Sequence, residues 1–204
     1  MYNFLETYIK QVEQELSTVP KGRREKLREV AEYIKKKHAE NESAKLTFIC
    51  THNSRRSTLS QVWAAVFAHY YGIDEVETYS GGTEATSFNP RAVAAIERAG
   101  FTVKNKEGEN PHYHVFFSDD AEPLECFSKT YDDPSNPQKN FAAVMTCSDA
   151  DQNCPFSPGA SKWISLPYRD PKESDGTPQE SDVYDERCRQ IAIEMAYVMS
   201  HSKF

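Results

Sequence analysis

LTFICTHNSRRSTLSQ, residues 46 to 61, contains the transition that decides the fold. Its first five residues form an apolar run that ends on Cys50, and a polar turn with two arginines follows at once. A short run of this kind, apolar on both faces, is typical of a strand buried in a parallel sheet. From Ser57 onward the apolar residues recur at helical spacing, at Leu59, Val62, Trp63, Val66, Phe67 and Tyr70. The stretch therefore predicts a buried strand, a polar loop and an amphipathic helix in direct succession.

The same alternation continues along the chain. Further apolar strands are predicted at VETYS (76–80), FAAVMTC (141–147) and KWISL (162–166). Helices are predicted after Asn89-Pro90 and over ESDVYDERCRQIAIEMAYVMS (180–200). Strands that alternate with helices indicate a parallel sheet with helices on both faces. We therefore expect a three-layer α/β/α domain with a four-stranded parallel sheet over residues 45–204.

Two segments lie outside this alternation. Residues 1–44 carry apolar residues at helical spacing in two runs separated by STVPKG, which predicts an N-terminal helical hairpin linked to the main domain. Residues of about 105–140 form an insertion, in which HYHVFFS (112–118) alternates as a strand does and ECFSKTY (125–131) can pair with it. The role of either segment, such as covering a site or binding a partner, stays open.

Composition excludes several classes of function. The chain has 204 residues and a net charge of −7, so a general nucleic-acid binder is not expected. Its 12% aromatic residues argue against a disordered chain. The mean hydropathy is −0.72 and no apolar run is long enough to span a bilayer or serve as a signal peptide. We therefore expect a cytoplasmic protein with no membrane partner. In that reducing setting its five cysteines are core residues, metal ligands or redox groups and not a disulfide framework.

Cys50 and Arg56 bracket a candidate oxyanion site, CTHNSRR, in which five residues separate the thiol from the arginine. Five residues are enough for backbone N–H groups to curl round a tetrahedral anion, and the following helix adds its dipole. Arg56 can grip two oxygens as a planar fork, while Ser57 can donate to the Cys50 sulfur and Asn53 can bond the loop backbone. The expected oxyanion-binding residues are Thr51, His52, Asn53, Ser54, Arg55, Arg56 and Ser57.

This loop resembles the phosphate-binding loop of the low-molecular-weight protein tyrosine phosphatase superfamily, where it also follows the first strand. TYSGGT (78–83) is similar to the Ser-Ala-Gly-Thr turn of that superfamily, and Arg169-Asp170-Pro171 stands where its Asp-Pro general acid is found. The resemblance covers roughly residues 45 to 200. It implies an enzyme in which Cys50 is the nucleophile and Asp170 the acid.

The superfamily contains phosphatases and thioredoxin-coupled arsenate reductases, and CSDADQNC (147–154) resembles the redox segment of the reductases. That resemblance implies that Cys147 and Cys154 relay a disulfide from Cys50 to thioredoxin across a mobile polar loop, with no bound cofactor. Lys172 and Glu173 follow Asp-Pro where phosphatases commonly have tyrosine. Gln61 replaces the glutamate that helps some reductases bind potassium, so no potassium site is inferred.

Other interpretations of the same residues stay open. Cys50 could be a buried core thiol, Asp170 a loop cap before proline, and Cys147 and Cys154 two unrelated residues. A zinc site could combine Cys147 and Cys154 with His112 and His114, although no tight Cys-x-x-Cys pair accompanies them. The leading function is arsenate reduction; the alternatives are hydrolysis of phosphotyrosine through a Cys50 phosphocysteine and non-catalytic anion sensing.

Overall fold

The central sheet has four parallel strands in the order β2-β1-β6-β7. In this computed structural model, which describes residues 1–105, 107–153 and 158–203, the strands are β1 (Ala44–Cys50), β2 (Val76–Gly82), β6 (Phe141–Met145) and β7 (Ala160–Ser165). The register places Ile49 of β1 opposite Met145 of β6, so the residues after both strands meet at one edge of the sheet. The predicted four-stranded parallel sheet is confirmed.

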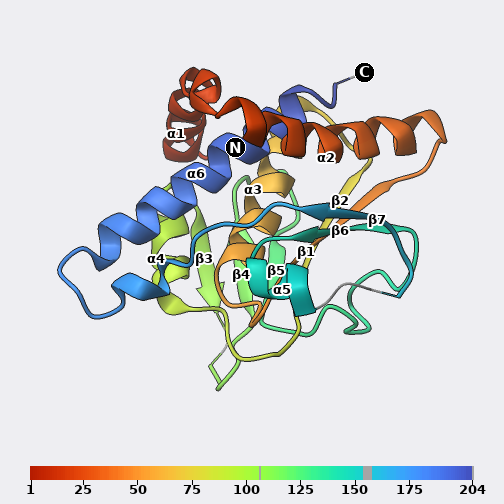
Figure 1. The fold of residues 1–204 in the computed structure, drawn as a ribbon. Helices are drawn as coiled ribbons and strands as arrows, with labels where there is room; N and C mark the ends of the chain where they lie inside the picture. The colour runs from red at the N-terminus through yellow and green to blue at the C-terminus, as the bar shows by residue number, and fades with distance from the viewer. Residues whose placement is uncertain (106, 154–157, 204) are drawn as a thin grey trace.

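Helices cover one face of this sheet (Figure 1). They are α1 (Asn3–Gln14), α2 (Lys21–Ala39), α3 (Arg56–Tyr71), α4 (Pro90–Arg98) and α6 (Glu180–Ser200). Alternation along the strands explains the packing, since successive side chains point to opposite faces. Leu46 and Phe48 of β1 belong to the large helical core, whereas Ile49 belongs to a smaller cluster on the other face.

The second face is covered by α5 (Ser148–Asn153) and by part of the insertion. Its apolar cluster contains Phe141, Ala143 and Met145 of β6 together with Ala150 of α5, and Tyr131 of the insertion packs against it. The molecule therefore has the predicted three layers, with an N-terminal pair of helices added to the first.

The N-terminal helices pack mainly on α6 and β7. Leu5, Ile9 and Val12 of α1 are buried, as the helical spacing predicted. The first helix ends sooner than expected, at Gln14, and a short 3-10 helix η1 (Leu16–Thr18) leads to Pro20. Pro20 is the N-cap of α2, with an extended backbone at φ of −61° and ψ of 147°.

The insertion carries a second, antiparallel sheet in the order β3-β4-β5. Its strands are β3 (Thr102–Asn105), β4 (Tyr113–Phe116) and β5 (Leu124–Cys126). The pairing of β4 with β5 was expected. The second strand is shorter than the predicted ECFSKTY (125–131), since β5 begins at Leu124 and ends at Cys126. β3 was not predicted, because its residues are mostly exposed and show no apolar alternation.

After β5 the chain runs beside the end of β2. The N–H of Gly82 donates to Lys129 O at 2.8 Å, and the N–H of Tyr131 donates to Gly82 O at 2.9 Å. The approach is so close that a Cβ at Gly81 would lie 2.4 Å from Tyr131 Cα. A glycine is therefore required at this position in TYSGGT.

The sequence between Cys147 and Cys154 was predicted to be a loop, but the structure has the short helix α5 over Ser148–Asn153. Asp149 in its first turn favours that helix electrostatically. Within the described part of the chain, no helix is long and apolar enough to cross a membrane.

Candidate active site

Cys50 is the last residue of β1, and α3 begins six positions later at Arg56. The Cys50 side chain is almost fully buried, and its Sγ lies 3.1 Å from Ser57 Oγ in the first turn of α3. The sulfur therefore lies at the N-terminus of α3, within hydrogen-bond distance of a hydroxyl. The predicted contact between Ser57 and Cys50 is present.

Asn53 holds the loop between them in shape. Its backbone is left-handed, with φ of 46°, a conformation that asparagine tolerates better than most residues. Its Nδ2 donates to Ser57 Oγ at 2.9 Å and to Thr58 Oγ1 at 3.3 Å. Its Oδ1 accepts the N–H of Lys129 at 3.0 Å. The sequence predicted bonds to the loop's own backbone; these partners are instead two hydroxyls and the backbone of the insertion.

The insertion also fastens the loop at a second point. Ser128 Oγ donates to His52 O at 2.8 Å, and the N–H of Thr86 donates to Ser128 Oγ at 2.7 Å. Ser128 and Lys129 are thus structural supports of the oxyanion loop that the sequence did not reveal. No periodicity or motif identifies them, because their contribution depends on where residues 128–131 pass in space.

Gly82, the second glycine of TYSGGT, lies against the oxyanion loop. A Cβ at this position would lie 2.6 Å from Thr51 O and 2.8 Å from the Asn53 backbone nitrogen. The end of β2 therefore touches the oxyanion loop directly, and only glycine leaves room for it.

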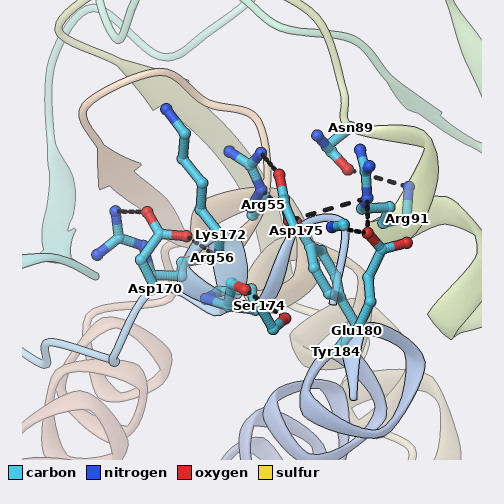
Figure 2. Close-up of polar contacts among 12 residues, drawn as sticks. Arg55, Arg56, Asn89, Arg91, Asp170, Lys172, Ser174, Asp175, Glu180 and Tyr184 are labelled. Carbon is cyan, nitrogen blue, oxygen red and sulfur yellow. Dashed lines mark hydrogen bonds and ion pairs between the residues drawn. The ribbon is translucent and has the colours of Figure 1, made fainter. Parts of the chain in front are cut away.

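Arg56 joins the loop to residues 166–176, which we call the acid loop. Its Nη2 is 2.6 Å from Asp170 Oδ2 (Figure 2). Its Nη1 donates to Tyr168 O at 3.2 Å. The guanidinium is largely buried. Asp170 also accepts the N–H of Lys172 and so caps the 3-10 helix η2 (Pro171–Ser174). Asp170 therefore lies beside the loop and also fulfils the capping role that the sequence left as an alternative.

Arg55 lies in a different environment from its neighbour. Its Nε donates to Tyr184 OH at 2.7 Å, and its NH2 is 3.2 Å from Asp175 Oδ2 (Figure 2). Tyr184 OH in turn donates to Asp175 Oδ1 at 2.8 Å, and burial raises the pKa of Tyr184 to about 12. The Arg55 side chain thus ties the start of α3 to the acid loop and to α6, which leaves Arg56 as the arginine next to Asp170.

Arg91 extends the same network, with its Nε 2.7 Å from Glu180 Oε2 (Figure 2). The carboxylate of Glu180 also accepts the N–H of Gly176 at 2.6 Å, so the end of the acid loop is anchored to the start of α6. Burial is partial for both members of this ion pair.

Cys147 follows β6 at the same edge of the sheet as Cys50. It is fully buried, and its Sγ lies 3.6 Å from Thr51 Oγ1. The N–H of Ala150, in the first turn of α5, donates to this sulfur at 3.3 Å. The structure therefore brings Cys147 against the loop that begins at Cys50. Cys154, the second thiol of the expected relay, lies outside the described residues.

The other two thiols belong to the large helical core and not to the cluster that contains Cys50 and Cys147. Cys126 ends β5, and Cys188 accepts the N–H of the Trp63 indole at 3.2 Å in the helical core. Burial raises the pKa of each thiol to about 12, so both are neutral near pH 7. Among the described residues no group of three or more His, Cys, Asp or Glu side chains could hold a metal ion. His112 instead contacts Glu125 and stacks on Phe127.

Comparison with known proteins places this fold and loop in a family. The family model for low molecular weight phosphotyrosine protein phosphatase matches residues 45–113. Arsenate reductase 2 of Staphylococcus epidermidis is 30% identical over 124 residues, which are 61% of this chain and 76% of that protein. The arsenate reductase of Bacillus subtilis is 29% identical over 142 residues, 70% of this chain and 84% of the relative. The chain belongs to the low molecular weight phosphotyrosine protein phosphatase family.

Solved structures agree on the fold. A YwlE mutant from Bacillus subtilis matches with a TM-score of 0.54 and 16% identity, over 78% of this chain and 97% of its own. The low molecular weight protein tyrosine phosphatase of T. tengcongensis matches with a TM-score of 0.52 and 16% identity, over 78% of this chain and 99% of its own. At 16% identity these matches establish the fold and nothing about function.

Proposed function

We propose that this protein is a thiol-dependent arsenate reductase that converts arsenate to arsenite. The observation that carries the proposal is the position of Cys147, whose sulfur is buried against Thr51 in the loop that starts at Cys50. A phosphatase needs one thiol at this loop, whereas reduction of an oxyanion by two electrons needs a second thiol within reach of the first. The arsenate reductases among the relatives support the same assignment.

The oxyanion would lie between the loop backbone and Arg56. The N–H groups of residues 51–56 and the N-terminus of α3 supply partial positive charge, and the Arg56 guanidinium supplies a planar fork. Arg55 contributes through its backbone N–H, since its guanidinium is engaged with Tyr184 and Asp175. The anion exchanges the Arg56–Asp170 contact for its own bonds, which frees the Asp170 carboxyl for proton transfer.

The first chemical step forms the bond between Cys50 sulfur and arsenic. The Cys50 thiolate attacks arsenate, and one oxygen leaves as water after Asp170 supplies a proton. Ser57 at 3.1 Å stabilises the thiolate before attack. No reduction has taken place at this stage, because arsenic keeps its oxidation state in the thiol adduct.

The second step transfers the electrons. Cys147, as thiolate, attacks the Cys50 sulfur, so that a Cys50–Cys147 disulfide forms and the electron pair of the S–As bond stays on arsenic, which leaves as arsenite. The N–H of Ala150 donates to the Cys147 sulfur and holds it beside the loop. Cys154 would then attack Cys147, restoring Cys50 and leaving a disulfide for thioredoxin to reduce. A cytoplasmic setting follows from this requirement for a reductant.

Phosphatase activity is the second candidate, favoured by the family and by the Asp170–Arg56 arrangement. Cys50 would then take the phosphoryl group from an aryl ester, and Asp170 would protonate the leaving oxygen and later activate water. This chemistry uses neither Cys147 nor Cys154, which makes the two functions separable by mutation.

The test is NADPH oxidation driven by arsenate, with thioredoxin and thioredoxin reductase present. A reductase turns over as wild type and loses turnover as Cys147→Ser or Cys154→Ser, while aryl phosphate hydrolysis by the same variants stays near wild type. Cys126→Ser is the matched control, since this buried thiol lies in the antiparallel sheet and should leave both rates unchanged. Absence of arsenate turnover, with equal ester hydrolysis by all of these proteins, would assign the phosphatase.

A further inference from the structure

Arg23 of α2 reaches across the interface between the N-terminal helices and the main domain. Its Nε donates to both carboxylate oxygens of Glu194 on α6, at 3.0 and 2.9 Å, and its NH2 donates to one of them at 2.8 Å. Glu194 is 3% exposed. This bidentate pair fixes the position of the guanidinium, since the planar fork of arginine matches a carboxylate.

The same guanidinium contacts the start of the acid loop. It lies 4.7 Å from the centroid of the Tyr168 ring, and its NH2 is 3.5 Å from Leu166 O. Tyr168 is 4% exposed, so its ring is held between Arg23 and the core. A cation over a desolvated aromatic ring is attracted by the negative face of the ring. Arg23 therefore restrains both the side chain of Tyr168 and the backbone that leads to it at Leu166.

Tyr168 in turn acts on the site through its backbone. Its carbonyl accepts NH1 of Arg56, and Asp170 stands two residues further along and meets NH2 of the same guanidinium. Asp170 and Arg56 thus share a support that begins at Arg23. This residue lies outside residues 45–113, which the family model matches.

We propose that Arg23 is a positioning residue, which sets the Tyr168 carbonyl and thereby the orientation of Arg56 and Asp170. The N-terminal helices then have a role in the site, which the sequence left open. The inference rests on the oxyanion-binding role of Arg56 and the acid role of Asp170 proposed above. A misplacement of about 1 Å at such a distance from the chemistry can lower a rate by about 100-fold.

The chain offers a matched control in which the same chemistry joins the same two segments elsewhere. Arg189 of α6 pairs with Glu15 at 2.5 Å, and its guanidinium lies 4.5 Å from the ring centroid of Tyr8 in α1. This arginine–glutamate–tyrosine set ties the N-terminal helices to α6 without touching the acid loop. Replacing either arginine should weaken the packing of the N-terminal helices on α6. Only replacement of Arg23 should also disturb the acid loop.

The experiment compares Arg23→Met with Arg189→Met in three measurements. The first is hydrogen exchange of residues 166–176. The second is the Kd of phosphate, taken from protection of Cys50 against iodoacetamide. The third is kcat and KM for arsenate, measured with thioredoxin and thioredoxin reductase, and for an aryl phosphate. We expect Arg23→Met to speed exchange in the acid loop, raise the phosphate Kd about ten-fold and lower kcat by ten-fold or more. Arg189→Met should change none of these beyond its effect on Tm.

Arg23→Lys separates positioning from charge. Lysine keeps the positive charge beside Glu194 but lacks the planar fork, so its kcat and exchange rate should fall between wild type and Arg23→Met. It also serves where Arg23→Met does not fold. Equal acid-loop exchange in the Arg23 and Arg189 variants, or a loss of activity that only follows Tm, overturns the proposal. The proposed function fails separately, if the wild-type protein neither binds phosphate nor turns over. Faster acid-loop exchange in the Arg23 variants alone would then still support the coupling between Arg23 and the acid loop.

Discussion

Replacement of Asn53 tests how the insertion supports the oxyanion loop. Asn53→Ala removes the side-chain acceptor of the Lys129 N–H and the donor to Ser57 and Thr58. Asn53 is fully buried, so water does not replace these partners without rearrangement. The matched variant is Asn53→Gly, which removes the same bonds but accepts the left-handed backbone at φ of 46° without steric cost.

The magnitude follows from the partners that each variant leaves behind. A buried N–H left without an acceptor costs about 1–3 kcal/mol, and each lost hydrogen bond between neutral groups about 1 kcal/mol. An alanine in the left-handed region adds about 1 kcal/mol that glycine avoids. We expect the free energy of unfolding to fall by about 4 kcal/mol in Asn53→Ala and by about 3 kcal/mol in Asn53→Gly.

The assay is equilibrium unfolding in urea, with alkylation of Cys50 measured on the folded proteins. Both variants should also lose phosphate protection of Cys50, because the loop no longer holds its N–H groups inward. The reasoning is refuted if both variants stay within about 1 kcal/mol of wild type. A glycine variant no more stable than the alanine variant would refute the backbone contribution alone.

Two further predictions follow from packing and burial. Gly82→Ala places a Cβ 2.4 Å from Glu84 O and should lower both Tm and Cys50 reactivity, whereas Gly22→Ala, with no atom within 4 Å of its Cβ, should leave activity unchanged and raise Tm slightly. Burial raises the pKa of Cys126 and Cys188 from 9.0 to about 12, so each stabilises the folded state below about pH 9 and loses that contribution as pH rises towards 12. Unfolding free energy measured between pH 9 and 12 should therefore fall less steeply in the double alanine variant than in wild type; equal slopes would contradict the assignment.

The elements that the sequence predicted correctly are those in which apolar residues carry the signal. The runs before Cys50 and Cys147 are buried over their length, and their parallel register brings the two cysteines to one edge of the sheet. The Asp-Pro step could be placed for a similar reason, since proline and a capping carboxylate determine local structure. These are local rules, and they were enough for the fold and for the edge of the sheet where the site lies.

The unpredicted features depend on contacts between residues far apart in the chain. Arg55 and Arg56 are adjacent in sequence, yet their guanidinium groups take different partners, Asp175 and Asp170. Arg23 pairs with Glu194, which lies 171 positions away, so no local pattern predicts this contact. Ion pairs of this kind have no periodicity. They become visible only when the packing of the helices is known.

The most direct test of the central claim is a single turnover by Cys154→Ser with arsenate and no external reductant. The account predicts one equivalent of arsenite and a Cys50–Cys147 disulfide in the peptide map, since the relay stops at its second thiol. Hydrolysis of aryl phosphate without arsenite or that disulfide would contradict the reductase assignment and leave Cys147 as a buried neighbour of the loop.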